Sequence, residues 1–276
     1  MIKFDKNGWQ AKISEEVTFA NVEKVVRAYA DYLTEKKITA KGLIIGYDSR
    51  FLSEKFAERA VMVMEDFGIS SFLTERDTPD PAITWEVKDK KVAGAFMVTG
   101  GNLPADYSGI RIIPDEKESV DTINANLDKP QPSVKLSSVK GKAERFDPRD
   151  RYLAYIENQV DPAVIKKAHL TVVVDPMFGS GRGYLDLILQ KLGCRVEEIH
   201  GYRDVLFGGL SPDPGEENLS ELKAKVNELK ADLGLALSGD GVSFAVIDKT
   251  GKYYAAKTEG IEGALRAVEK VARSKL

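Results

Sequence analysis

The chain has 276 residues, of which 43% are hydrophobic and 30% are charged, as in a globular protein of one large or two ordinary domains. Its 40 basic and 43 acidic residues give a formal net charge of −3 and form no basic block, so nucleic acid is not expected as a partner. The single cysteine, Cys194, excludes an internal disulfide and a cysteine-based zinc site.

Strands and helices are predicted to alternate along the first half of the chain. The N-terminal stretch carries charges where a signal peptide needs an apolar core, and no apolar run reaches the roughly 20 residues of a membrane span. We therefore expect a cytoplasmic chain without a membrane partner. Apolar spacing predicts helices over residues 18–37, 52–67, 81–88 and 116–127. Short apolar runs predict strands over residues 43–47, 69–73, 92–98 and 110–113.

A second alternating region follows residues 129–140, which are rich in Pro, Ser and Lys and are predicted to be a linker. Strands are predicted over residues 170–174, 195–199, 234–237 and 244–247. Helices are predicted over residues 184–192, 218–230 and 259–275, and residues 248–251 are typical of a hairpin turn. We therefore predict an α/β fold with two domains, residues 1–145 and 146–276. Each is expected to be an α/β/α three-layer sandwich with a mixed sheet.

Residues 175–186, which read DPMFGSGRGYLD, form a glycine-rich turn between a predicted strand and a predicted helix. Such a turn can hold phosphate on its backbone N–H groups, and Glu197 and Glu198 end the next strand, as in dinucleotide-binding folds. The spacing does not fit, because Tyr184 stands where the third glycine is needed. A structural turn is favoured, and a nucleotide-binding module remains the outside alternative.

Three other polar positions are candidate sites. His169 and His200, the only histidines, lie at strand boundaries with no third ligand near in sequence, so neither a hydrolase nor a histidine metal site is expected. Asp48-Ser49-Arg50 follows a strand, where α/β folds place ligand sites. It is either a salt-bridged turn next to a site or, the favoured interpretation, an N-cap in which Asp48 or Ser49 begins the next helix.

Two glycine turns follow predicted strands but lack the side chains that chemistry needs. Residues 97–111 read MVTGGNLPADYSGIR, and no side chain at the Gly100-Gly101 turn is a nucleophile, acid or base. Residues 237–243 read LSGDGVS, whose one carboxylate is Asp240, whereas Mg²⁺ is held by several oxygen ligands. Alone, this second stretch is typical of a β-turn.

Together these stretches resemble the α-D-phosphohexomutases, the phosphoglucomutase/phosphomannomutase family. The resemblance lies, in the family's order, in residues 46–57, 97–111, 175–186, 203–219 and 232–241. It extends to about residue 252, and the predicted helix over 259–276 has no clear counterpart. Members of the family are four-domain enzymes, and the loops that mark their third and fourth domains are absent here. The resemblance therefore implies a chain that contains only the first two domains.

The resemblance also implies that the family's catalytic serine loop is altered. In that family a serine in a T-A-S-H-N-P loop carries the phosphate that is exchanged with the sugar. Gly101 aligns with this serine and Asn102 with the histidine. Pro104, Tyr107 and Gly109 match the remaining positions of the family's loop. Thr99 and Ser108 supply hydroxyls nearby, but neither falls at the exposed turn.

The family's D-G-D-x-D-R loop, which holds Mg²⁺ through three aspartates, is altered in the same way. Asp240 matches, whereas Ser238 and Val242 replace two aspartates. Ser243 replaces the arginine of this loop, and Gln10 replaces another arginine near the N-terminus. No cofactor is expected, because most of the ligand set for the family's Mg²⁺ is lost.

These changes remove the nucleophile, two metal ligands and two arginines, which are the main parts that phosphoryl transfer needs. We therefore expect a truncated, non-catalytic relative that acts in binding, regulation or assembly and is linked to hexose-phosphate metabolism. Self-association or another protein is the expected partner, together with weak sugar-phosphate binding. The alternative is an enzyme, either half of a split mutase completed by another chain or a protein with altered chemistry.

Overall fold

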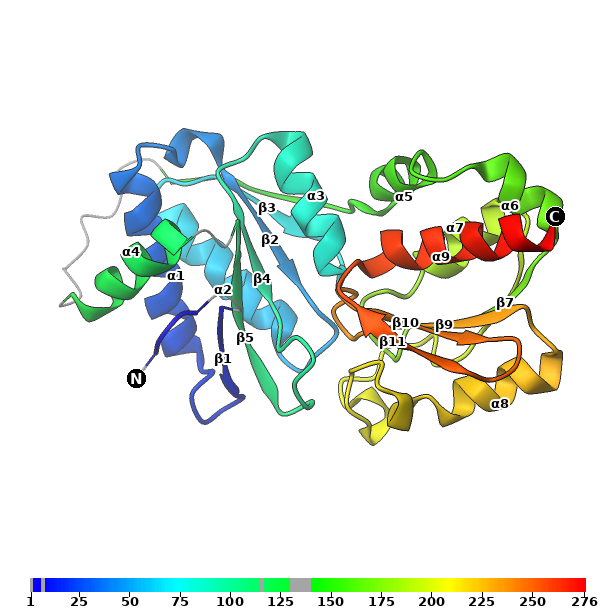
Figure 1. Cartoon of the computed structure of the whole chain (residues 1–276). Coiled ribbons are helices and arrows are strands. Elements are labelled where there is room, and N and C mark those ends of the chain that lie inside the picture. The colour runs from blue at the N-terminus through cyan, green and yellow to red at the C-terminus, as the bar shows by residue number, and fades with distance from the viewer. Residues whose placement is uncertain (1, 6–7, 115–116, 130–139) are drawn as a thin grey trace. The chain divides into compact units, whose positions relative to one another are not determined.

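The computed structural model describes residues 2–5, 8–114, 117–129 and 140–276 (Figure 1). Most of the predicted linker, residues 129–140, lies outside these ranges. The chain divides into two compact units, residues 1–78, 82–100 and 106–148, and residues 79–81, 101–105 and 149–276. None of the helices in the described ranges combines the length and the apolar character that crossing a membrane requires.

A mixed sheet of six strands forms the centre of the first unit, in the order β1-β5-β4-β2-β3-β6. Strand β5 is antiparallel to both of its neighbours, β1 and β4, and the other pairs are parallel. The strands are β1 Trp9–Lys12, β2 Leu43–Tyr47, β3 Ser71–Thr74, β4 Ala95–Val98, β5 Tyr107–Ile113 and β6 Ala143–Phe146. Strand β2 is buried along its whole length, which is why it reads as a continuous apolar run.

Helices cover both faces of this sheet. They are α1 Phe19–Glu35, α2 Ser53–Asp66, α3 Asp80–Lys90 and α4 Lys117–Asp128. The main core lies between the sheet and α1, α2 and α4, where α1 buries one apolar face after its Thr18 N-cap. A smaller core beneath α3 contains Ile83 and Val87, packed against Ile44 and Met97 of the sheet.

The second unit has a mixed sheet of five strands, in the order β11-β10-β9-β7-β8. Strand β7 is parallel to β8 and β9, whereas β10 is antiparallel to β9 and β11. The strands are β7 Thr171–Asp175, β8 Arg195–Glu198, β9 Leu233–Leu237, β10 Phe244–Asp248 and β11 Tyr253–Lys257. Its helices are α5 Arg149–Glu157, α6 Pro162–Ala168, α7 Leu185–Lys191, α8 Ser220–Leu229 and α9 Gly260–Lys275.

In the second unit, α8 covers one face of the sheet, and α9 lies on the other face beside α6 and α7 (Figure 1). Helix α8 buries Leu222 and Val226 against β7, β9 and β10. Helix α9 buries Ile261, Leu265 and Val268, the apolar face that its spacing predicts. The prediction of two α/β/α domains with mixed sheets is therefore confirmed.

Candidate functional site

The loop after β2 is organised around the buried carboxylate of Asp48. One oxygen, Oδ1, accepts hydrogen bonds from the backbone N–H of Arg50 at 3.1 Å and from the Ser53 hydroxyl at 2.8 Å. The other, Oδ2, accepts from Arg50 Nε at 3.0 Å and from the Thr99 hydroxyl at 2.8 Å. The Asp48 and Arg50 side chains are 1% and 0% exposed, so this is a fully buried ion pair.

The expected N-cap at Asp48 or Ser49 is wrong, and the salt-bridged turn is what forms. Helix α2 begins after Leu52, which has a left-handed backbone with φ 62° and makes no side-chain cap hydrogen bond. The physical reason is that a buried guanidinium needs a counter-charge, and Asp48 supplies it. Arg50 also donates from Nη1 to the carbonyl oxygen of Tyr107 at 3.1 Å, which ties this turn to the first residue of β5.

Two glycines in and next to the loop between β4 and β5 lie so close to neighbouring atoms that no side chain fits there. A Cβ at Gly100 would lie 2.7 Å from Cζ of Arg50, and one at Gly109 would overlap the carbonyl oxygen of Trp9, so both positions need glycine. Gly101 has a left-handed backbone with φ 56°, and the side chain of the next residue, Asn102, is exposed. The turn at Gly100 and Gly101 therefore presents no nucleophilic side chain.

The nearby hydroxyls are not placed to act as nucleophiles. Thr99 is 1% exposed, and its hydroxyl donates to Asp48. Ser108 lies on β5 and is 0% exposed, and its hydroxyl has no hydrogen-bond partner within the described ranges. A nucleophile must be accessible to its substrate, and both of these hydroxyls are buried.

The loop after β9 is closed by its own hydrogen bonds. Asp240 Oδ1 accepts from the Ser238 hydroxyl at 2.7 Å and from the backbone N–H of Val242 at 3.1 Å. The Ser238 hydroxyl in turn accepts from the backbone N–H of Ser243 at 2.9 Å, and Gly241 N donates to Ser238 O at 2.8 Å. As the turn chemistry predicts, Asp240 accepts a backbone hydrogen bond.

This loop does not fit Mg²⁺. The ion prefers several anionic or water oxygens in octahedral geometry, and the loop offers one carboxylate whose Oδ1 already accepts two hydrogen bonds. Val242 contributes only an apolar side chain. Within the part of the chain that the structure describes, no group of three or more His, Cys, Asp or Glu is arranged to hold a metal ion.

The glycine-rich turn after β7 packs directly against the loop after β9. Ser180 donates to the carbonyl oxygen of Gly239 from its backbone N–H at 2.8 Å and from its hydroxyl at 3.0 Å. A Cβ at Gly179 would lie 2.5 Å from the Gly239 backbone. Arg182 directs Nη1 at the carbonyl oxygens of Phe178 and Gly179. These contacts explain the glycines by close packing, in agreement with the favoured interpretation as a structural turn.

A cluster around His200 was missed by sequence reasoning. His200 Nδ1 lies 3.0 Å from Asp175 Oδ1, and Nε2 lies 3.1 Å from Glu221 Oε2. The ring packs on Phe178 with centroids 4.4 Å apart. His169, by contrast, is the boundary residue expected, since it ends α6 in a left-handed conformation with φ 49°. Asp175 is the last residue of β7 and His200 follows β8, the adjacent parallel strand; the signal in the sequence was that both lie at the carboxyl ends of predicted strands.

The stability supplied by His200 is expected to fall as the pH rises. The hydrogen bond to Asp175, and then the charges of Asp175 and Glu221, raise the pKa of His200 above its ordinary value of 6.5. A raised pKa in the folded state stabilises the chain fully below pH 6.5 and ceases to do so above the folded pKa. Urea unfolding of wild type and His200→Asn at several pH values should show the gap between them narrowing toward alkaline pH. A constant gap would contradict the ion pair.

Glu198, at the end of β8, is the other perturbed group in this region. Burial, followed by the charges of Asp186 and Asp175, raises its pKa to about 7, against the opposing effect of Arg182. A carboxyl with this pKa is only partly ionised at neutral pH.

Comparison with known proteins places both units in one family. The description "Phosphoglucomutase/phosphomannomutase, alpha/beta/alpha domain I" matches residues 1–129, and the corresponding domain II matches residues 150–251. A phosphoglucomutase/phosphomannomutase of Thermococcus kodakarensis is 27% identical over 91% of this chain and 56% of its own length. A phosphomannomutase/phosphoglucomutase of Pseudomonas putida is 31% identical over 83% of this chain and 50% of its own length.

Solved structures agree with the sequence comparison. A structure from Thermus thermophilus that carries the name phosphomannomutase superposes with a TM-score of 0.82 at 25% identity. It covers 92% of this chain and 58% of that one. This chain spans about half the length of the curated relatives it matches. The chain belongs to the phosphoglucomutase/phosphomannomutase family and contains its alpha/beta/alpha domains I and II.

Proposed function

We propose that this chain is a non-catalytic member of the family, acting in the cytoplasm in binding, regulation or assembly linked to hexose-phosphate metabolism. The proposal rests on the β4–β5 loop, which presents no nucleophilic side chain at Gly101, the residue that the resemblance aligns with the family's serine. The loop after β9 supports the proposal as well, because it has one carboxylate, Asp240, where the family's motif has three aspartates. A phosphoglucomutase and phosphomannomutase assay of the purified chain is the direct test, and no turnover is expected.

An enzymatic role in combination with another chain is the second candidate. The relatives are named as mutases, and this chain covers about half of their length. A second chain would then have to supply a nucleophile and metal ligands as well as the remaining domains. Co-purification from the source cells tests this candidate, which requires a mutase-active complex that contains this chain.

The chain is expected to bind Mg²⁺ no better than a salt control. One carboxylate and a serine hydroxyl give too little anionic oxygen to displace water from hydrated Mg²⁺. Isothermal titration should show no specific heat at millimolar metal, and the thermal midpoint should match that in an equal ionic strength of NaCl. A midpoint that rises with Mg²⁺ in wild type but not in Asp240→Ala would contradict the non-catalytic proposal.

We further propose that the chain self-associates or binds another protein. The segment after His200 exposes three large apolar side chains, Tyr202, Leu206 and Leu210, which are 64%, 61% and 41% accessible. Apolar side chains gathered on one surface segment are typical of interaction sites. Sedimentation velocity should show a larger species whose proportion falls in Leu206→Glu. A monomer at every concentration, with no captured partner, would oppose the proposal.

A further inference from the structure

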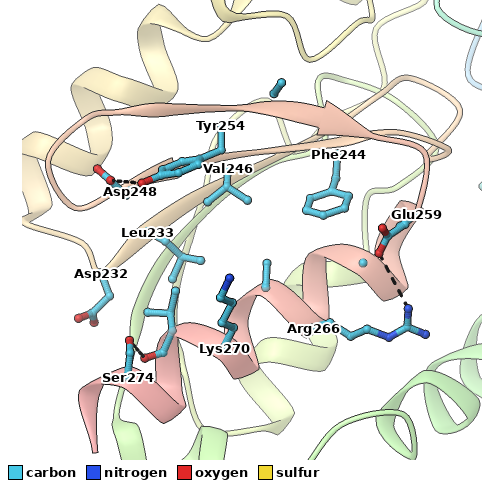
Figure 2. A pocket seen from close by; sticks show the side chains of 14 residues that line it. Asp232, Leu233, Phe244, Val246, Asp248, Tyr254, Glu259, Arg266, Lys270 and Ser274 are labelled. Carbon is cyan, nitrogen blue, oxygen red and sulfur yellow. Dashed lines mark hydrogen bonds and ion pairs between the residues drawn. The ribbon is translucent and has the colours of Figure 1, made fainter.

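A pocket of about 630 Å³ lies in the second unit between α9 and the β9-β10-β11 side of the sheet (Figure 2). This volume is within the range of sites for small organic ligands, roughly 300–1,000 Å³. None of the residues that line it belongs to the loop after β4 or to the turn Ser238–Ser243. The pocket is therefore independent of the features that support the proposed function.

The walls of the pocket are mostly apolar. Leu233, Phe244 and Val246 extend from the sheet toward α9 in Figure 2, and Ala267 and Val271 line the pocket from the helix. Phe244 is itself 6% exposed, so its ring is fixed by packing rather than free to fill the space. Such walls favour a ligand with a flat or compact apolar body, since burying apolar surface supplies the main driving force.

The carboxylates around the pocket are already engaged. Asp232 pairs with Lys275 at 2.9 Å, and Asp248 accepts from Thr250 and from the Tyr254 hydroxyl. Glu259 lies 4.0 Å from Arg266, which also pairs with Glu262 at 3.4 Å. Asp232 and Glu259 therefore have cationic partners, whereas Asp248 is held by hydrogen bonds from uncharged groups and keeps its negative charge.

Lys270 is different. It projects from α9 toward the space between the helix and the sheet (Figure 2), and it makes no hydrogen bond or ion pair with any residue that the structure describes. An ammonium group next to an apolar wall attracts an anion more strongly than one in open solvent. The pocket thus combines an apolar surface with one uncompensated positive charge.

We propose that this pocket binds a small organic monoanion with an apolar body, such as an aromatic carboxylate or sulfonate. The body packs between Phe244, Val246 and Val271, and the anionic group pairs with Lys270. Arg266 is held by its two glutamates and does not take part.

The probe for the test is 8-anilinonaphthalene-1-sulfonate, an aromatic monoanion, titrated into the full chain by fluorescence and calorimetry. Saturable binding of one probe per chain is expected, weakened roughly tenfold in Lys270→Glu because attraction becomes repulsion. Lys167→Glu is the matched control, since this exposed helix lysine does not line the pocket, and its affinity should equal wild type. Ala267→Trp, which fills the pocket, should abolish binding while far-ultraviolet circular dichroism and the thermal midpoint stay close to those of wild type.

Two results would overturn the proposal. Equal probe affinity in Lys270→Glu and Lys167→Glu would show that the charge is not used. Unsaturable probe binding, together with a change of sedimentation coefficient in Ala267→Trp, would show that the pocket is a protein interface instead. Neither result bears on mutase activity, so this proposal and the proposed function fail separately.

Discussion

The purified chain is expected to show no phosphoglucomutase or phosphomannomutase turnover, even with Mg²⁺ and a hexose bisphosphate activator. Under the proposed function, Gly101 stands where the family's phosphate-carrying serine is expected, and covalent catalysis without its nucleophile loses rate on the order of 10⁶-fold. The hydroxyls of Thr99 and Ser108 do not compensate, because both residues are buried. A coupled assay with glucose 1-phosphate and mannose 1-phosphate measures this, with an active family member in parallel as the positive control.

Gly101→Ser alone is expected to leave the chain inactive. The new side chain would stand on a backbone with φ 56°, a conformation that costs a non-glycine residue about 1–2 kcal/mol. The loop after β9 would still contain only one carboxylate, that of Asp240, as a ligand for Mg²⁺. Wild-type turnover that disappears in Asp240→Ala would refute the non-catalytic proposal, whereas turnover unaffected by Asp240→Ala would indicate a contaminating enzyme.

Most of the regular elements were predictable because their burial leaves a strong periodic pattern, whereas the helices α5 and α6 and the strands β1, β6 and β11 were not predicted. The strand predicted over 170–174 and the helix predicted over 259–275 correspond to β7, Thr171–Asp175, and α9, Gly260–Lys275. Strand β6, Ala143–Phe146, escaped prediction because it is a largely exposed edge strand with two charged residues. Its place is set by parallel pairing with β3, about 70 residues earlier in the chain, which no local pattern encodes. This strand extends the first unit to residue 148, slightly beyond the predicted boundary.

In the candidate loops, too, some features could be predicted from the sequence and others could not. The proposed losses at Gly101, Ser238 and Val242 can be inferred from the sequence, because they depend only on which residue stands at each position of the family's motifs. The bonds of Asp48 to Thr99 and of His200 to Asp175 are not visible in the sequence, because they depend on which strands become neighbours. Thr99 lies 51 residues from Asp48 in the chain, and Asp175 lies 25 residues from His200. Only the parallel pairings of β2 with β4 and of β7 with β8 bring these groups together.

The second large effect is expected on stability, at Asp48. Asp48→Ala should lower the free energy of unfolding by about 3–5 kcal/mol, because it leaves the Arg50 guanidinium buried without its counter-charge. Both side chains are almost completely inaccessible, so bulk solvent does not screen the charge that remains on Arg50. The Thr99 and Ser53 hydroxyls would lose their acceptor as well. Urea unfolding at neutral pH, followed by circular dichroism, measures the change.

Two further variants separate the buried charge from a general effect of removing an acid. Asp106→Ala breaks the exposed pair with Lys12, where the atoms are 3.9 Å apart, and should cost at most about 1 kcal/mol. Asp48→Ala combined with Arg50→Met should recover part of the lost stability, because the second change removes the uncompensated charge. If Asp48→Ala costs no more than Asp106→Ala, the ion pair does not hold the loop. If the double variant is less stable than Asp48→Ala, Arg50 stabilises the loop chiefly through its bond to the Tyr107 carbonyl oxygen rather than through its charge pair.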